Sequence, residues 1–256
     1  MIKINFIFDK TIKSKKLKYV LLKKYKNYGI SKCDVFVVGG GDGFMLNILK
    51  KYHKFNKPFY GINCGSFGFL MNSYSQINLE NKILKSKKII INPLEIKTLD
   101  KSKRVKRIIA INEVSVFRQS KQTSSLKVSV GKNTIVKKLV GDGVLISTPA
   151  GSTAYNLSIN GPILSLNSGK LAVTPISPFR PRRWKGKIIS NNFTILIKNY
   201  DFVKRPVAAV ADNMEVRNIK NLKVKINKKI KIKLLYDKKR NLTKKIKIEQ
   251  IKKKTS

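Results

Sequence analysis

The feature that most constrains the fold of this chain is a glycine loop between an apolar run and a helical pattern. Residues 34–38 are mostly apolar, and residues 39–43 read Gly-Gly-Gly-Asp-Gly. Apolar residues then recur at helical spacing from Phe44 to Leu49. A buried strand, a glycine turn and a helix in this order indicate a parallel α/β sheet, in which ligands bind at the carboxyl ends of the strands.

Neighbouring segments extend this pattern. Residues 2–8 are strand-like, and Leu17 and Leu21 begin a helical pattern that we expect Ser14 to cap. Residues 58–63 read as a further buried strand. The first part of the chain is therefore predicted to be an α/β domain with a Rossmann-like parallel sheet.

The pattern changes after about Pro93 to short runs with alternating apolar and polar residues. Residues 126–130 and 134–136 alternate on either side of a Gly-Lys-Asn turn, which predicts a hairpin. Residues 207–210, followed by Ala-Asp-Asn, continue this pattern. A mainly antiparallel, β-sandwich-like domain is expected here.

These patterns predict three segments. The α/β domain with the glycine loop would occupy residues 1–95, and the β-rich domain residues 96–237. The Lys-rich segment 238–256 would end the chain and could return to the first domain. A chain of 256 residues is long enough for two domains of ordinary size.

The charge is strongly unbalanced, with 56 Lys and Arg against 13 Asp and Glu and a formal net charge of +43. Such an excess is typical of proteins that bind polyanions, above all nucleic acids. The lysines are nevertheless scattered through nearly every segment beside abundant Ile and Asn, which favours a compositional bias over a specific nucleic-acid function. In either case the field should attract nucleotides and polyphosphates.

The sequence gives no sign of a membrane span or of a metal site made by the protein alone. No apolar run is long enough to cross a bilayer, and the first residues lack the features of a secretory signal. Cys33 and Cys64 have no metal-ligand spacing and are expected to be reduced thiols of a cytoplasmic protein.

The glycine loop is the first candidate site. The backbone of Gly39, Gly40, Gly41 and Gly43 can come close to phosphate groups, and free amides at a helix start favour anions. Asp42 would repel phosphate unless it binds a divalent metal or accepts a proton from an attacking hydroxyl. The alternative is a tight turn in which Asp42 caps the helix.

Two weaker candidates follow. Phe67 lies in a glycine-rich stretch, residues 61–70, and could pack against a base. Asn112 and Glu113 begin a strand-like segment, where an amide can pair with an adenine edge and a carboxylate can hold ribose hydroxyls. An ordinary strand end would look the same.

The most informative stretch is residues 141–158, where a strand leads into a loop rich in glycine, small and hydroxyl residues. Backbone amides and hydroxyls of such a loop can converge on a polar ligand, and Tyr155 could add a stacking face. A purely structural role accounts poorly for so many small polar residues after a buried strand.

Together these stretches resemble the NAD kinase family, which has a Gly-Gly-Asp-Gly loop, an Asn-Glu pair and a long Gly-Asp-Gly then Gly-Ser-Thr-Ala-Tyr signature in this order. The resemblance covers roughly residues 35–216. It implies transfer of a phosphoryl group from ATP or polyphosphate to the adenosine ribose 2′-hydroxyl of NAD, with NAD in a cleft between two domains.

The resemblance also implies roles for individual residues. Asp42 would accept the proton of the 2′-hydroxyl. Asp142 would bind a polar group of NAD, and Asp142 and the NAD molecule can belong to neighbouring subunits. The full set of implied NAD contacts is Asp42, Gly43, Phe67, Asn112, Glu113, Asp142, Ala150, Thr153, Ala154, Tyr155, Asn156, Leu157 and Ser158. At Ala150 many members have Thr, and Asp212 and Asn213 replace a commoner Asp-Gly turn and receive little weight.

Members of the family use a divalent cation, usually Mg²⁺, with the phosphoryl donor and are commonly homodimers or homotetramers. Neither a membrane nor a specific nucleic acid is an expected partner. Two alternatives stay open. A lipid or sphingoid kinase fits the glycine loop, and a nucleic-acid-binding protein on a degenerate kinase scaffold fits the charge.

Overall fold

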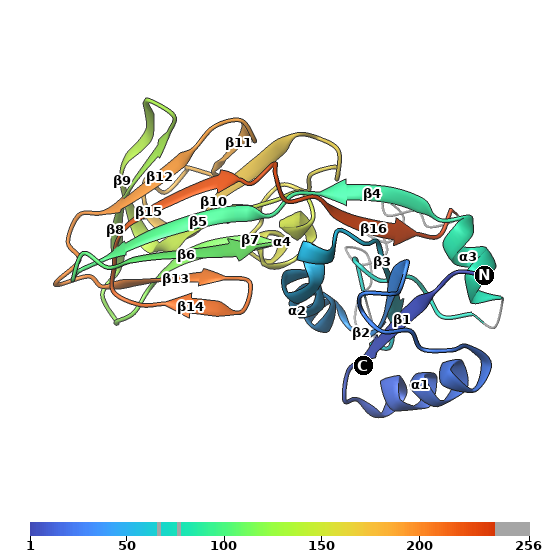
Figure 1. Ribbon diagram of the computed structural model, residues 1–256. Coiled ribbons are helices and arrows are strands. Elements are labelled where there is room, and N and C mark those ends of the chain that lie inside the picture. Colours follow the sequence, from blue (N-terminus) through green and yellow to red (C-terminus); the bar gives the residue numbers. More distant parts are fainter. Residues whose placement is uncertain (66–67, 76–77, 239–256) are drawn as a thin grey trace, which may run out of the picture. The chain divides into compact units, whose positions relative to one another are not determined.

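The computed structural model describes residues 1–65, 68–75 and 78–238 (Figure 1). They form two compact units, which are described separately. Unit 1 contains residues 1–91 and resumes at residue 231, and unit 2 contains residues 92–230. Phe67 and nearly all of the Lys-rich segment 238–256 lie outside the described residues, so the expectations for them are not addressed by the structure.

Unit 1 is built on a sheet in the order β1-β2-β3-β16-β4, parallel except for β4. Its strands are β1 Ile4–Phe8, β2 Val35–Gly40, β3 Phe59–Asn63, β4 Lys87–Ile91 and β16 Ile232–Tyr236. All six residues of β2 are buried, as expected for a central strand with both faces covered. The predicted Rossmann-like parallel sheet is confirmed.

β16 comes from the far end of the chain. It pairs in parallel with β3 and antiparallel with β4, although the sequence pattern had grouped its residues with 96–237. A short apolar run does not show which sheet it joins, because a parallel partner can lie far away in the sequence. Here the chain leaves unit 1 after β4 and re-enters it at β16.

The helices of unit 1 are α1 Ile12–Lys24, α2 Asp42–Tyr52 and α3 Leu79–Leu84, with a 3-10 turn at His53–Phe55. The expected Ser14 cap is wrong by three residues. Thr11 is the N-cap, and its hydroxyl accepts the Ser14 amide at 3.3 Å. Ser14 is instead buried and donates its hydroxyl to the Gly39 carbonyl at 3.0 Å, tying α1 to the end of β2.

Unit 2 is an eleven-stranded, mainly antiparallel sheet in the order β14-β13-β7-β9-β8-β12-β15-β5-β6, with β10 pairing with β9 and β11. Its strands are β5 Leu94–Asp100, β6 Val105–Ala110, β7 Glu113–Arg118, β8 Ser124–Val130, β9 Asn133–Ser147, β10 Lys170–Arg180, β11 Lys187–Ser190, β12 Ile195–Asn199, β13 Val207–Ala211, β14 Met214–Val216 and β15 Ile219–Ile226. A 3-10 turn, η2 Gly151–Thr153, and a short helix, α4 Tyr155–Ser158, follow β9.

The predicted hairpin of unit 2 is present, and a second one follows the strand-like residues 207–210. β8 and β9 pair across the turn at Gly131, which has a positive φ of 57° that glycine adopts easily. β13 and β14 pair across the turn at Asp212. The inward-facing aliphatic residues of the strands form one core cluster that includes Val116, Leu139 and Ile146, so the antiparallel β-rich domain is confirmed.

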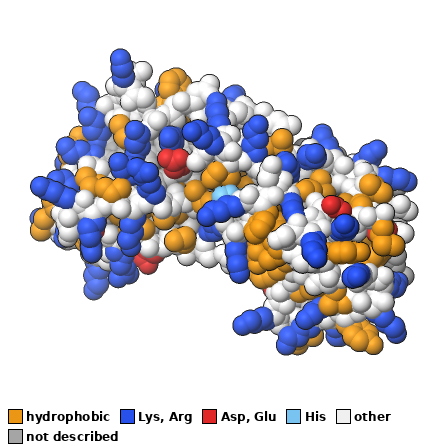
Figure 2. Space-filling view, viewed as in Figure 1, with side chains coloured by type: hydrophobic (Ala, Val, Ile, Leu, Met, Phe, Trp, Pro, Cys, Tyr) orange, Lys and Arg blue, Asp and Glu red, His pale blue; other side chains and the backbone are white. Residues whose placement is uncertain are grey.

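Lys and Arg side chains are abundant on the visible faces of both units, whereas Asp and Glu are sparse (Figure 2). Among the described residues, no helix is both long and apolar enough to span a bilayer.

Candidate functional site

The glycine loop lies where the sequence placed it, at the carboxyl end of β2 and the start of α2. Hydrogen bonds hold the loop on both sides. Asp9, after β1, donates its amide to the Gly39 carbonyl at 3.0 Å, and Cys64, after β3, donates its amide to the Gly40 carbonyl at 2.9 Å. The ends of three adjacent parallel strands therefore fix the loop, in the position where α/β sheets bind ligands.

The glycines of the loop are of two kinds. A Cβ atom added to Gly39 would lie 2.6 Å from the Phe8 ring, and one added to Gly40 would lie 2.7 Å from the Phe44 ring. These two glycines are needed for packing. At Gly41 and Gly43 an added Cβ would meet no described residue within 4 Å, and neither glycine has a positive φ. The fold itself does not require glycine at these two positions.

Asp42 is the first residue of α2, and its carboxylate reaches across to a neighbouring loop. Its two oxygens accept the backbone amides of Phe69 at 2.7 Å and Leu70 at 3.0 Å. The side chain is partly exposed. Its orientation is therefore set by the backbone beyond β3, which is more than a helix cap requires.

Asp9 is a second carboxylate at this loop, which the sequence did not single out. Its Oδ2 would lie 3.0 Å from a Cβ on Gly40. Burial alone would raise the pKa of Asp9, but hydrogen bonds from Thr11, Ser14 and the Gly41 backbone lower it overall. A charged carboxylate thus stands beside the loop amides, and only the structure could reveal this, because β1 and β2 are joined by a long connection.

In unit 2, Asn112 and Glu113 lie at the start of β7 with their oxygens directed inward. Asn112 Oδ1 and Glu113 Oε2 are both buried and have no hydrogen-bond partner among the described residues. Burial, reinforced by the negative charge of Asp212, raises the pKa of Glu113 to about 8. A buried acceptor without a partner costs about 1–3 kcal/mol, so two adjacent ones indicate a place for a ligand's donors.

Asp212, to which the sequence analysis gave little weight, holds this strand start in place. Its carboxylate accepts the amides of Ile111 and Asn112, each at 2.9 Å, and that of Glu113 at 3.4 Å. Its backbone amide in turn donates to the Glu113 carbonyl at 3.1 Å. The residue has φ +51° in the β13–β14 turn, a conformation that Asp tolerates better than most residues. Only the pairing of β13 with β7 shows this role.

Asp142 lies on β9 and forms an ion pair with Arg118 at the end of β7, with 2.5 Å between Nε and Oδ1. No pattern in the sequence pointed to Arg118. Tyr155 in α4 is 39% exposed. Its burial, and then the charges of Asp142 and Glu113, raise the pKa of its hydroxyl. The charges of both acids therefore act on Tyr155, and all three predicted residues belong to the same part of unit 2.

The loop after β9 packs against Asn112. Thr148 donates its hydroxyl to the Ile111 carbonyl at 2.7 Å and its amide to the Asn112 carbonyl at 2.8 Å. A Cβ on Gly151 would lie 2.2 Å from the Asn112 carbonyl oxygen. Glycine is required there by the close approach of two backbones.

Residues further along this loop differ in exposure. Asn156 is fully buried, and its amide donates to the carbonyls of Ser152 and Pro162 and accepts the Thr174 hydroxyl at 2.7 Å. Its side chain therefore shapes the loop. Of the other expected contacts, Ala150 is buried, Thr153, Ala154 and Leu157 are half-buried, and Ser158 is exposed.

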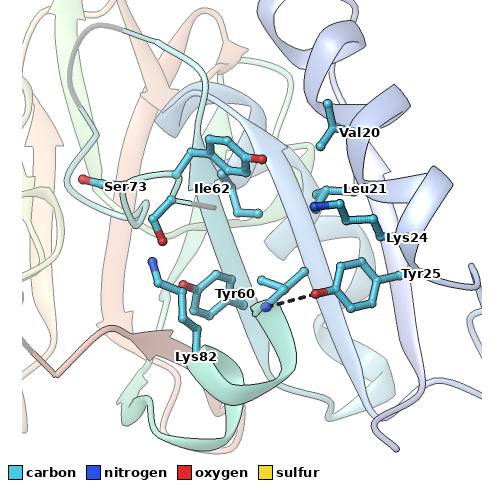
Figure 3. Close-up of a pocket in the computed structure, with 11 residues that line it drawn as sticks. Val20, Leu21, Lys24, Tyr25, Tyr60, Ile62, Ser73 and Lys82 are labelled. Atoms are coloured by element: carbon cyan, nitrogen blue, oxygen red, sulfur yellow. Dashed lines mark hydrogen bonds between the residues drawn. The ribbon is translucent and has the colours of Figure 1, made fainter. Parts of the chain in front are cut away.

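One small pocket lies outside these groups. It is bordered by α1, β3 and α3 of unit 1, and the Tyr25 hydroxyl at its edge accepts the Leu79 amide at 3.1 Å (Figure 3). Its volume is about 30 Å³, which is room for roughly one water molecule. None of the candidate site residues that the structure describes lines it.

Within residues 1–65, 68–75 and 78–238, no group of three or more His, Cys, Asp or Glu side chains could hold an ion.

Comparison with known proteins gives one consistent family. Residues 111–228 match the ATP-NAD kinase C-terminal domain. The chain is 43% identical to the NAD kinase of Zymomonas mobilis over 92% of both chains, and 46% identical to that of Rhizobium meliloti over 83% of both.

Two solved structures share the fold. The NAD kinase of Archaeoglobus fulgidus in complex with ATP has a TM-score of 0.76 at 21% identity, covering 96% of this chain and 98% of its own. Yeast NADH kinase complexed with NADH has a TM-score of 0.78 at 18% identity, covering 98% and 87%. With relatives above 40% identity along most of its length, the chain belongs to the NAD kinase family.

Proposed function

We propose that this protein is an NAD kinase, which phosphorylates the adenosine ribose 2′-hydroxyl of NAD to give NADP, with ATP as a phosphoryl donor. The observation that carries the proposal is the pair of buried, unpartnered oxygens on Asn112 and Glu113. Adenosine offers donors to both, an exocyclic amine for the amide oxygen and ribose hydroxyls for the carboxyl group. The apolar chain of a lipid substrate offers no such donors, so the two oxygens favour a nucleoside over the lipid-kinase alternative.

The state of Glu113 supports this assignment. With a pKa of about 8, Glu113 is mainly protonated at pH 7, so its carboxyl group can donate one hydrogen bond and accept another. A ribose hydroxyl has the same dual capacity. Tyr155 adds an aromatic face close to Glu113 and Asp142, and Asp142 presents a carboxylate to a polar group of the dinucleotide. Thr153, Ala154, Leu157 and Ser158 would contact NAD by backbone or side chain.

Asp42 is the proposed proton acceptor for the attacking 2′-hydroxyl. Its oxygens are held by the amides of Phe69 and Leu70, so the carboxylate does not have to be reoriented for the reaction. As the 2′-oxygen attacks the terminal phosphorus of the donor, its proton passes to Asp42. The bond between that phosphorus and the leaving group, which is ADP when ATP is the donor, breaks.

The open glycines Gly41 and Gly43 would let the donor phosphates approach the amides at the start of α2. When bound with the donor, Mg²⁺ would neutralise charge on the phosphates, and Asp42 and Asp9 are the carboxylates at this loop that could share it. These two acids with phosphate oxygens and water fit the ligand preferences of Mg²⁺. The use of polyphosphate as an alternative donor is part of the proposal.

A homodimeric or homotetrameric state and a cytoplasmic location complete the proposal, on the strength of the family resemblance. Sedimentation equilibrium of the full chain tests the first. A monomer at micromolar concentration that still makes NADP would contradict it.

The reaction is tested by NADP formation from NAD, Mg²⁺ and either ATP or polyphosphate. Glu113→Ala is the informative variant, because it should weaken NAD binding while leaving ATP binding unchanged. Arg104→Ala is the control, because Arg104 lies exposed in the connection between β5 and β6, and this variant should behave as wild type. Folded wild-type protein that makes no NADP with either donor would contradict the proposal.

A further inference from the structure

A second candidate for function lies on the solvent-facing side of the sheet in unit 2. Two depressions lie there, with volumes of about 460 and 640 Å³. The first is lined by Lys97, Lys127, Lys198 and Lys223. The second is lined by Lys137, Lys138, Lys204 and Arg205. We call the two depressions together the basic trough.

The two depressions are neighbours along the β8–β12 ladder. Lys127 and Lys198 are direct partners in the register of these strands and line the first depression. Two residues further on, Ser125 and Tyr200 line the second, and the Tyr200 amide donates to the Ser125 carbonyl at 3.0 Å. The trough therefore runs over strands β5, β15, β12, β8 and β9, which spans roughly 19 Å at the usual strand spacing of about 4.8 Å.

Like charges face one another across the strands of this trough. Lys97 pairs in register with Lys223 on β15 and with Arg107 on β6, and Lys127 pairs with Lys198. Like charges directly opposite each other destabilise a sheet. Among the described residues, none of the eight cations lining the trough forms an ion pair with a carboxylate.

Acidic residues do little to offset this charge. Of the residues that the structure describes, no acidic one lines the first depression, and Asp201 is the one acid that lines the second. The Asp201 carboxylate accepts the Lys204 backbone amide at 3.1 Å and so belongs to the local turn. Figure 2 shows how few acidic side chains the visible face of the molecule carries. The repulsion in the trough would be relieved by an anion that spans several strands.

The trough also offers surfaces for stacking and apolar contact. Tyr200 is 48% exposed and lines the second depression together with its four cations. Leu196 and Val105 are exposed in the first. An exposed aromatic side chain in a cationic groove is the combination that binds single-stranded nucleic acids, whose phosphates contact cations while the bases stack. Paired bases of a duplex are not free to stack in this way.

We propose that the basic trough binds single-stranded nucleic acid, without sequence preference, through its lysines and Tyr200. This function is separate from the proposed kinase reaction and does not depend on it. A lysine-rich composition puts cations on every surface, so the test must separate the trough from charge in general.

The test measures binding of a fluorescein-labelled 15-nucleotide oligouridylate to the full chain by fluorescence anisotropy. The trough variant carries Lys97→Gln, Lys127→Gln, Lys198→Gln and Lys223→Gln. The matched control carries four changes on exposed lysines of α1, Lys15→Gln, Lys16→Gln, Lys18→Gln and Lys23→Gln. Both variants lose the same number of positive charges, and thermal melts check that each is folded.

We expect the trough variant to lose about tenfold or more in affinity near 100 mM KCl. The slope of its plot of log affinity against log salt concentration should become shallower by up to about 3, since each phosphate contact on a single strand contributes about 0.7 to this slope. The α1 control should stay within about twofold of wild type. Equal losses in both variants, or no binding by wild type, would overturn the proposal. If the quadruple variant does not fold, Lys127→Gln and Lys198→Gln are tested singly.

Tyr200→Ala separates a nucleic acid from a bare phosphate chain. Stacking on an aromatic ring contributes about 1–3 kcal/mol per base, so this variant should bind the oligonucleotide about fivefold or more weakly. Its affinity for inorganic polyphosphate should be unchanged, because polyphosphate has no bases. Unchanged oligonucleotide binding would show that the trough accepts any phosphate chain and would overturn the assignment to nucleic acid.

Discussion

Gly43→Ala should separate stability from catalysis in this protein. Gly43 is the second residue of α2, its φ is not positive, and an added Cβ would meet no described residue within 4 Å. Alanine restricts the unfolded chain more than glycine does and favours the helix, so the free energy of unfolding should rise by about 0.4–1 kcal/mol. Yet the new methyl group would stand where we propose that the donor phosphates approach.

We therefore expect Gly43→Ala to melt at or slightly above the temperature of wild type while kcat/KM for ATP falls at least tenfold, which corresponds to about 1.4 kcal/mol. The assays are a thermal melt and initial rates of NADP formation at varied ATP. Gly29→Ala is the matched control, because Gly29 is also open and has no positive φ. It should retain full activity. Full activity in Gly43→Ala would refute the proposal that the open glycines serve the donor.

Three further changes test other parts of the site. Gly151→Ala would place a Cβ 2.2 Å from the Asn112 carbonyl oxygen, and the backbone there cannot move away easily. The variant should destabilise unit 2 by about 2 kcal/mol or more in chemical denaturation, and wild-type stability would contradict this. Asp212→Ala removes the acceptor of the Ile111 and Asn112 amides, so the free energy of unfolding should fall by about 2–4 kcal/mol and NAD should bind more weakly in calorimetry. A loss of stability with unchanged NAD binding would contradict a role for Asp212 in positioning the site. Because the folded pKa of Glu113 is raised from 4.5 to about 8, its contribution to stability is complete below about pH 4.5 and is lost as pH rises to about 8. Glu113→Gln should remove this loss, which amounts to up to about 4 kcal/mol in the free energy of unfolding. If the variant and wild type show the same pH dependence of stability, Glu113 is not buried as described.

Local patterns were enough to predict much of the fold. The apolar run 35–38, the glycine loop and the helix after it follow from composition and spacing, as does the β8–β9 hairpin. Each of these features is set by residues that are close in sequence. β16 shows the limit, because its pairing with β3 joins segments more than 160 residues apart, and its own pattern carries no sign of its partner.

The same distinction applies to the site. The candidates Asp42, Asn112 and Glu113 were visible because each stands beside a recognisable strand end. Asp9 was missed because its contact with the Gly41 backbone joins residues that are distant in sequence, and Asp212 was discounted because it accepts the distant amides of Ile111 and Asn112. The two kinds of glycine in the loop cannot be told apart in the sequence. Only the neighbours of an added Cβ distinguish the glycines needed for packing from those that leave space for a ligand.

The role of Asp42 is tested most directly by the turnover of Asp42→Asn compared with its affinity for NAD. General-base catalysis contributes about a hundred- to ten-thousandfold, so kcat should fall by at least a hundredfold. The dissociation constant for NAD, measured by calorimetry, should stay within about threefold of wild type. Asparagine keeps one oxygen for the Phe69 and Leu70 amides, so a thermal melt must show that the variant is folded. A folded variant with near-normal kcat would contradict the account.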